Sequence, residues 1–227
     1  MDERKRIVQA GYDALGPRFT AWAANIVDDT RHRLLDDFAS RLPDGARVLE
    51  LGCGAGLPAT RKLADRFEVV GVDISAAQLA LARGNVPQAT FVEADFLTLD
   101  LPPRSFDGVC AFYSITHVPR DAHAELFRRI ATWLEPEGLF LASLSAGGSN
   151  DWTGEWLGVE MFFSGFDADT NRRLLWDAPF ALVVDEIVTV EEPEGPATFL
   201  WVLAKTASSA RPRRGAGEFR QGAPGAP

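Results

Sequence analysis

One stretch of the sequence decides the fold: Val48-Leu49-Glu50-Leu51-Gly52-Cys53-Gly54-Ala55-Gly56. Apolar residues lead into three glycines at alternate positions, and a segment with helical character, residues 57–67, follows. A buried strand that passes through a glycine-rich turn into a helix is the first unit of a doubly wound α/β sheet, and ligands bind at such turns. Glycine lets the backbone approach a ligand because it has no Cβ, and the helix N-terminus can face an anionic group.

The segments around this turn alternate between strand-like and helix-like patterns. We expect strands at 47–51, 69–73, 90–93, 106–112 and 139–144, with helices at 57–67, 75–83 and 121–134. This alternation predicts a parallel sheet with helices on both faces. After an irregular stretch and a helix near 169–176, two last strands are expected at about 182–190 and 198–205. The turn-rich run 191–196 joins them, so this pair must be antiparallel.

The remaining segments give the domain organisation. Residues 2–16 suit a short helix and 17–41 a longer one with apolar side chains at intervals of four. We interpret residues 1–205 as a single domain in which residues 1–41 form a helical N-terminal cap. Residues 206–227 are rich in Ala, Gly, Pro and Ser and hold one large apolar residue, Phe219, which predicts a disordered tail.

Charge disfavours a general nucleic-acid binder. The formal net charge is −9, and residues 206–227 carry four arginines against one glutamate. The expected tail is therefore +3 and the expected domain −12, a charge that repels phosphate backbones. The sequence has no run of about 18 apolar residues, so we expect no membrane-spanning helix. The charged start, Met-Asp-Glu-Arg-Lys-Arg, lacks the apolar region of a secretory signal.

The cysteine and histidine content bears on location and metal binding. There are two cysteines, Cys53 and Cys110, which suits a reducing compartment, so we expect a cytoplasmic protein. Three histidines without a CxxC or HExxH motif predict no metal site.

The glycine spacing separates two kinds of nucleotide-binding turn. The dinucleotide fingerprint GxGxxG needs a glycine at position 57, where this chain has Leu57. The GxGxG spacing from Gly52 to Gly56, followed by Asp73 at the end of the next strand, resembles the class I S-adenosylmethionine-dependent methyltransferases. The resemblance covers roughly residues 7–205. It implies a Rossmann-like α/β fold: a seven-stranded, mostly parallel sheet with an antiparallel last strand and a helical N-terminal extension.

The resemblance also implies S-adenosylmethionine as cofactor. Asp73 would accept hydrogen bonds from both ribose hydroxyls, Asp95 would bind the adenine amino group, and Phe96 would lie against the ring. The start Gly11-Tyr12-Asp13 resembles the family's Tyr-Asp start, whose tyrosine can reach the cofactor. The implied cofactor contacts are Tyr12, Glu50, Gly52, Cys53, Gly54, Gly56, Asp73, Ile74, Asp95, Phe96 and Phe112.

The exit of the fourth strand bears on the reaction. It lacks the Asn/Asp-Pro-Pro-aromatic run of enzymes that methylate amino groups of nucleic acids, the Pro-Cys nucleophile of cytosine-C5 enzymes, and the Asp of metal-dependent catechol-type enzymes. Phe112-Tyr113-Ser114 with His117 instead resembles the small-molecule branch, which includes quinone-biosynthesis and natural-product enzymes. His117 or Tyr113 would act as the general base if the acceptor is a phenol, enol or hydroxyl, whereas an acid that is already deprotonated or a neutral amine would need no base. A His117 that only lines the pocket or caps the next helix is the alternative.

Two further segments resemble parts of the family. Leu134-Glu135-Pro136-Glu137-Gly138 resembles its Leu-x-Pro-Gly-Gly turn, with Glu137 in place of the first glycine. Residues 150–166 are rich in aromatic side chains and occupy the position of the segment that covers the substrate. We expect substrate contacts from Trp152, Trp156, Met161 and Phe162. The alternative is that these side chains pack a subsidiary core under a long loop.

The sequence therefore predicts an enzyme that transfers a methyl group from S-adenosylmethionine to an O, N or C nucleophile of a small aromatic or hydrophobic molecule. One alternative is an NAD(P)-dependent oxidoreductase, which Leu57 disfavours. Another is a protein that binds S-adenosylmethionine without catalysis. The sequence leaves open the identity of the acceptor and whether the protein is a monomer or a homodimer.

Overall fold

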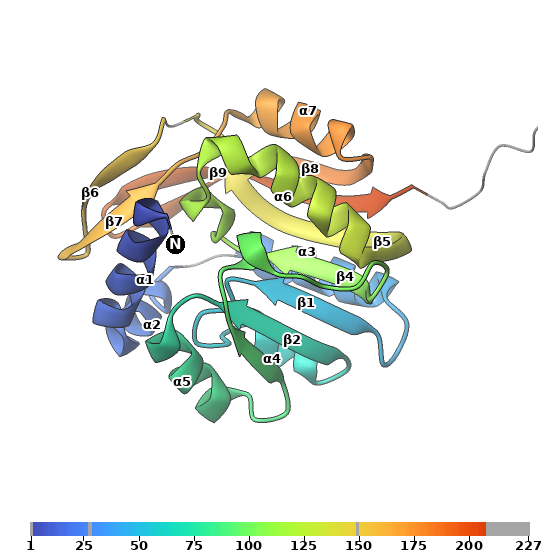
Figure 1. The fold of residues 1–227 in the computed structure, drawn as a ribbon, viewed down its shortest axis with the longest axis horizontal. Coiled ribbons are helices and arrows are strands. Elements are labelled where there is room, and N and C mark those ends of the chain that lie inside the picture. Colours follow the sequence, from blue (N-terminus) through green and yellow to red (C-terminus); the bar gives the residue numbers. More distant parts are fainter. Residues whose placement is uncertain (1, 27–28, 149, 208–227) are drawn as a thin grey trace, which may run out of the picture.

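A seven-stranded sheet forms the centre of the molecule (Figure 1). The structure is a computed structural model that describes residues 2–26, 29–148 and 150–207. Strand order is β3-β2-β1-β4-β5-β9-β8, with β1 to β5 parallel and β9 antiparallel to both of its neighbours. The strands are β1 (Arg47–Leu51), β2 (Glu68–Asp73), β3 (Thr90–Glu93), β4 (Phe106–Ala111), β5 (Leu134–Ser145), β8 (Phe180–Glu192) and β9 (Gly195–Thr206). This confirms the predicted Rossmann-like sheet, whose order reverses between β1 and β4.

Helices pack on both faces of the sheet because successive strand side chains point to opposite sides. Leu49 and Leu51 of β1 belong to a buried cluster with α6 (Arg120–Trp133) and α7 (Ala168–Asp177). Val48 belongs to a second cluster on the other face, with α3 (Asp29–Arg41) and α4 (Ala59–Ala64). Helix α5 (Ala76–Asn85) links β2 to β3.

The N-terminal cap contains three helices where the sequence indicated two. Helix α1 (Glu3–Leu15) agrees with the prediction, but the helix expected over 17–41 is divided into α2 (Pro17–Ala23) and α3. After α2, the N–H groups of Asn25 and Ile26 bond to the carbonyls of Trp22 and Ala23 in tight turns rather than continuing the helix. The apolar side chains at intervals of four suggested one helix, but only those in the second half of the segment, such as Leu34 and Phe38 of α3, are buried in the core.

A two-stranded hairpin lies in the stretch that the sequence indicated as irregular. Strands β6 (Trp152–Trp156) and β7 (Val159–Phe163) pair through a turn at Leu157 and Gly158, which have φ of 53° and 77°. Two positive φ values are what a tight hairpin turn needs. The hairpin lies against α1 (Figure 1), so closely that a Cβ on Gly11 would be 2.7 Å from the Met161 Cε.

Other elements differ from the prediction mainly in their bounds. Helix α4 is shorter than the expected 57–67, because it starts after a cis Leu57–Pro58 bond and ends at Ala64. Glu137, which stands where the resembling turn has its first glycine, has a φ of 68°, a conformation that glycine adopts at lower cost. Thr206 still belongs to β9, and the remainder of the predicted tail, apart from Ala207, lies outside the described residues. Within the described part of the chain, no helix has the length and hydropathy to cross a membrane.

Gly108 of β4 provides a test of the packing between the sheet and α3. A Cβ at this position would lie 2.5 Å from the Phe38 Cζ and 3.1 Å from the Leu42 Cδ1. We expect Gly108→Ala to lower the free energy of unfolding by ~1–3 kcal/mol through overpacking. Urea denaturation is the measurement. The control is Gly84→Ala in α5, where a Cβ meets nothing within 4 Å and where alanine should stabilise the helix by ~0.5–1 kcal/mol. Equal stability changes in the two variants would contradict the packing described here.

Candidate active site

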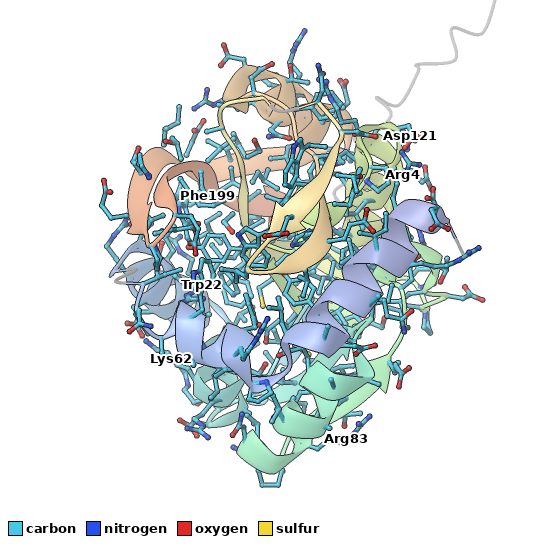
Figure 2. The ribbon with its side chains drawn as sticks, turned by 90° about the vertical axis from the view of Figure 1, so that its left-hand side faces the viewer. Arg4, Trp22, Lys62, Arg83, Asp121 and Phe199 are labelled. Carbon is cyan, nitrogen blue, oxygen red and sulfur yellow. The ribbon has the colours of Figure 1, made fainter. Side chains whose placement is uncertain are left out.

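A cavity of about 780 Å³ opens at the carboxyl ends of β1, β2 and β4. Its lining includes residues of α1, α2, the β6–β7 hairpin and the adjoining ends of β8 and β9. Figure 2 views the molecule from the side of α1 and this hairpin and labels two lining residues, Trp22 and Phe199. Ligands bind at this edge in open α/β sheets, so we take the cavity as the candidate active site.

The glycine turn forms the floor of the cavity. Gly52 has a φ of 74°, and a Cβ on it would lie 2.3 Å from the Ser114 Cβ, so a larger residue cannot occupy this position. Gly54 has a φ of 53° and open space around it. Both line the cavity, whereas Gly56 does not and instead approaches Val86 of the segment after α5. Gly56 is therefore part of the turn but does not line the cavity, where a cofactor contact was expected.

Asp73 lies beside this turn with its carboxylate held by the backbone. Its Oδ2 accepts a hydrogen bond of 2.8 Å from the Gly54 N–H, and its Oδ1 accepts one of 2.9 Å from the Ser75 N–H. Burial raises the pKa of Asp73, and these backbone N–H groups act in the opposite direction. Each carboxylate oxygen keeps a second acceptor position, so Asp73 can receive two hydroxyl groups from a ligand.

Gln78 is a site residue that the sequence analysis missed. Its Nε2 donates to the Gly16 carbonyl over 2.9 Å, while its buried Oε1 has no hydrogen-bond partner within the described residues. An orphaned buried acceptor is costly unless a ligand or water donates to it. Gln78 lines the cavity and follows the cap Ser75 by three residues on α5, a spacing that places both on one face.

Asp95 is paired with a cation from the N-terminal cap. Its Oδ1 accepts a hydrogen bond of 2.9 Å from the Leu97 N–H, and its Oδ2 forms an ion pair with Lys5 of α1. Both side chains are largely buried. Phe96 lies next to this pair in the cavity wall. A ligand amino group that binds Asp95 must therefore share the carboxylate with Lys5 or displace it.

Glu50 and Arg31 line the cavity near the glycine turn. Glu50 is buried and accepts a hydrogen bond of 2.5 Å from Thr60 Oγ1. Burial raises the pKa of Glu50 to about 7, while the Thr60 bond and the charge of Arg31 limit the rise. The Arg31 guanidinium, contributed by α3, lies 5.6 Å from the centre of the Tyr113 ring. Arg31 was not predicted, because nothing local in the sequence links α3 to the turn.

His117 forms a dyad with Tyr12. Its Nδ1 lies 2.7 Å from the Phe162 carbonyl and its Nε2 lies 2.8 Å from the Tyr12 hydroxyl. A carbonyl only accepts, so Nδ1 carries the proton and Nε2 receives the hydroxyl hydrogen of Tyr12. Burial lowers the pKa of His117 to about 4 and raises that of Tyr12. The imidazole is therefore neutral at physiological pH. It does not cap α6, whose N-cap is Pro119.

Aromatic side chains enclose the rest of the cavity. Trp152 and Trp156 line it as expected, and so do Phe19, Trp22 and Phe163, which were not among the predicted contacts. Met161 and Phe162 do not line it. They are buried against Val8 and Leu15 of α1 in a small separate core, so we withdraw these two from the expected substrate contacts. The alternative of a subsidiary core thus describes part of the segment.

The structure brings most of the predicted site residues together around this cavity. Tyr113 lines it with its ring packed edge-on against Phe199 and Trp201 at centroid distances of 4.8 and 5.8 Å. Among the predicted residues, the lining set is Tyr12, Glu50, Gly52, Cys53, Gly54, Asp73, Ile74, Asp95, Phe96, Phe112, Tyr113, His117, Trp152 and Trp156. The described residues contain no group of three or more His, Cys, Asp or Glu side chains that could hold a metal ion.

Part of the chain is similar to known protein families. A family model described as a methyltransferase domain matches residues 48–138, which include the glycine turn, Asp73, Asp95 and the dyad histidine. Residues 48–138 of this chain are therefore similar to a methyltransferase domain. A trans-aconitate 2-methyltransferase of Variovorax paradoxus is 38% identical over 117 residues, 49% of this chain and 44% of that protein.

A second curated protein and one solved structure are also similar to this chain. A 27-O-demethylrifamycin SV methyltransferase of Amycolatopsis mediterranei is 33% identical over 149 residues, 56% of this chain and 54% of that protein. The chain thus spans about half the length of these curated relatives. The fold also matches the crystal structure of Burkholderia thailandensis 1,6-didemethyltoxoflavin-N1-methyltransferase, with a TM-score of 0.69, 20% identity and coverage of 91% of this chain and 90% of that one.

The buried Glu50 makes stability depend on pH. Its pKa is about 7 in the folded protein against an ordinary 4.5, so the folded state binds the extra proton between these values. Its contribution to stability is complete below pH 4.5 and is lost as the pH rises through 7, by about 3 kcal/mol in total. We expect Glu50→Gln to gain stability relative to wild type across this window in denaturant titrations at several pH values.

Glu68→Gln on the neighbouring strand is the control for Glu50→Gln, because it removes an exposed carboxyl group. We expect it to lack the gain in stability that Glu50→Gln shows. A pH-independent difference for Glu50→Gln would contradict the buried position described for this side chain.

Proposed function

We propose that the protein is an S-adenosylmethionine-dependent methyltransferase that methylates an O, N or C nucleophile on a small aromatic or hydrophobic molecule. The observation that carries this proposal is the arrangement at the switch point of the sheet. There the glycine turn, Asp73 and the unpaired Gln78 Oε1 lie in one cavity with a neutral His117. The methyltransferase domain and the relatives named above support the same activity.

The residues in the cavity fit this cofactor from end to end. Asp73 and Gln78 offer acceptors for the ribose hydroxyls, and a charged acceptor forms the stronger bond. Asp95 would accept a hydrogen bond from the adenine amino group after its ion pair with Lys5 opens, and Phe96 would pack against the adenine ring. The methionine carboxylate needs a cation, and Arg31 is the lining cation near the glycine turn. Bound there, the cofactor supplies a methyl group already activated by its sulfonium.

The chain's own part in the reaction is to position the acceptor, exclude water and move a proton. Tyr12 and His117 form a relay in which the Tyr12 oxygen takes a proton from the acceptor while the Tyr12 proton passes to His117 Nε2. The low pKa of His117 makes the imidazole a weak base, so the relay suits an acceptor that releases its proton as the new bond forms. The aromatic walls keep water from the methyl group.

The alternatives differ from this proposal in the ligand they require. The turn that binds a nicotinamide dinucleotide has a glycine at the position of residue 57. In this chain the side chain of Leu57 occupies that position and lines the cavity. We also propose that the protein works in the cytoplasm, since Cys53 and Cys110 are both buried free thiols. The acidic domain favours a small-molecule acceptor over nucleic acid.

Asp73→Asn tests the ribose contact. We expect the affinity for S-adenosylmethionine to fall at least about tenfold, because hydrogen bonds to a charged acceptor are lost. Calorimetric titration measures this, with Asp65→Asn, an exposed residue that ends α4, as the matched control. Wild-type affinity in Asp73→Asn would show that the ribose binds elsewhere. Binding of NADH in place of S-adenosylmethionine would overturn the proposed function.

Tyr12→Phe tests the relay, because it removes the hydroxyl bonded to His117 and keeps the ring. We expect the rate of S-adenosylhomocysteine formation to fall by about 10²-fold or more with cofactor affinity nearly unchanged. Tyr113→Phe, which removes the second tyrosine hydroxyl in the described cavity lining, is the matched comparison and should retain most of the turnover. The reverse order of the two variants would assign the proton transfer to Tyr113.

A further inference from the structure

The acceptor side of the cavity is a box of aromatic rings. Phe19 and Trp22 of α2 stack with an interplanar angle of 25° and a centroid distance of 5.9 Å. Trp156 of β6 meets Trp22 almost at a right angle, 81°, over 5.2 Å. Tyr12 contacts both Phe19 and Trp156. All four rings line the cavity, so an occupant of this end meets aromatic surface on several sides.

A carboxylate shares this aromatic end. Glu192 is the last residue of β8, is half-buried and lines the same cavity. Its charge acts on the Tyr12 hydroxyl, where it adds to the rise in the pKa of Tyr12. Within residues 2–26, 29–148 and 150–207, Glu192 has neither an ion pair nor a side-chain hydrogen bond. Its neighbour Glu194, by contrast, accepts a hydrogen bond of 3.0 Å from the Trp22 indole N–H.

The positive charges of the cavity lie elsewhere. Lys5 and Arg31 are the lysine and arginine side chains in the described lining. Lys5 is paired with Asp95, and Arg31 lies close enough to Glu50 to lower that group's pKa. The aromatic end is therefore left with an uncompensated negative charge. Burial of that charge and the nearby Glu194 raise the pKa of Glu192, a cost that a bound cation would remove.

We propose that the aromatic box of Tyr12, Phe19, Trp22 and Trp156, together with Glu192, binds a cationic amino group of the methyl acceptor. Ring faces attract cations through their quadrupoles, most strongly where water is excluded, and the carboxylate neutralises the charge. This inference rests on the proposed function and narrows its substrate class to molecules that carry an amino group. A protonated nitrogen has no lone pair, so this nitrogen becomes the nucleophile only after it has lost its proton. The amine preference separates the protein from the trans-aconitate 2-methyltransferase it resembles, because a carboxylate-rich acceptor is repelled by Glu192.

Three probes of one shape test the charge preference. These are 2-phenylethylamine, 2-phenylethanol and 3-phenylpropanoate, whose end groups are cationic, neutral and anionic. Each is titrated into the full-length protein, with and without saturating S-adenosylhomocysteine, and followed by tryptophan fluorescence and calorimetry. We expect the amine to bind at least about tenfold more tightly than the alcohol and the carboxylate to bind most weakly. Equal affinities, a reversed order or no saturable amine binding would overturn the proposal.

Two variants at the end of β8 test the role of the Glu192 carboxylate. Glu192→Gln removes the charge in the box, and Glu191→Gln removes the same charge from the preceding exposed residue, which does not line the cavity. We expect the first variant to lose the preference for the amine over the alcohol and the second to keep it. A preference that survives Glu192→Gln would assign the selectivity to another group and refute the proposed site.

Cofactor binding and amine selectivity are tested by separate measurements. If S-adenosylhomocysteine and S-adenosylmethionine do not bind, the proposed function is wrong, whatever the probes do. If they bind and the probes show no charge preference, the methyltransferase function stands and the amine assignment is wrong. Faster turnover of anionic or phenolic acceptors than of amines would also show that the amine assignment is wrong.

Discussion

The rest of the site depends on the hydrogen bonds that the Asp73 carboxylate accepts from the backbone. The carboxylate receives the N–H groups of Gly54 and Ser75, so one side chain joins the turn after β1 to the start of α5. The fit is enforced from the other side by Ser114, which leaves no space for a Cβ on Gly52. The ends of three neighbouring strands are thereby fixed relative to one another before any ligand arrives, which is the preorganisation that tight binding requires.

Helix α1 connects the two ends of the cavity. Lys5 pairs with Asp95 at one end and Tyr12 bonds to His117 at the other, while the next residue, Asp13, accepts a 2.6 Å hydrogen bond from the Ser75 hydroxyl. One helix therefore carries an ion pair, a tyrosine–histidine hydrogen bond and an anchor on α5. The spacing of Lys5 and Tyr12, two turns apart, places them along the same side of the helix.

The sheet and the glycine turn could be predicted because their signals are local: apolar strands, alternate glycines and acidic strand ends. Lys5, Arg31, Gln78 and Glu192 could not, since each reaches the site through contacts between distant segments. The β6–β7 hairpin was missed because its aromatic residues suggested a loop, although Leu157-Gly158 between alternating residues was a usable turn signal. The break between α2 and α3 was missed because a periodic pattern continued across it.

The β6–β7 hairpin is a sheet of its own, joined to no strand of the main sheet. It supplies Trp156 to the acceptor side and Met161 to the contact with Gly11. Substitutions on its cavity face can therefore accumulate without disturbing the packing of β1 to β5. Under the proposed function, part of the acceptor-binding surface is thus carried by an element outside the sheet that holds the glycine turn, so acceptor selectivity could change in related proteins while the cofactor-binding turn stays the same.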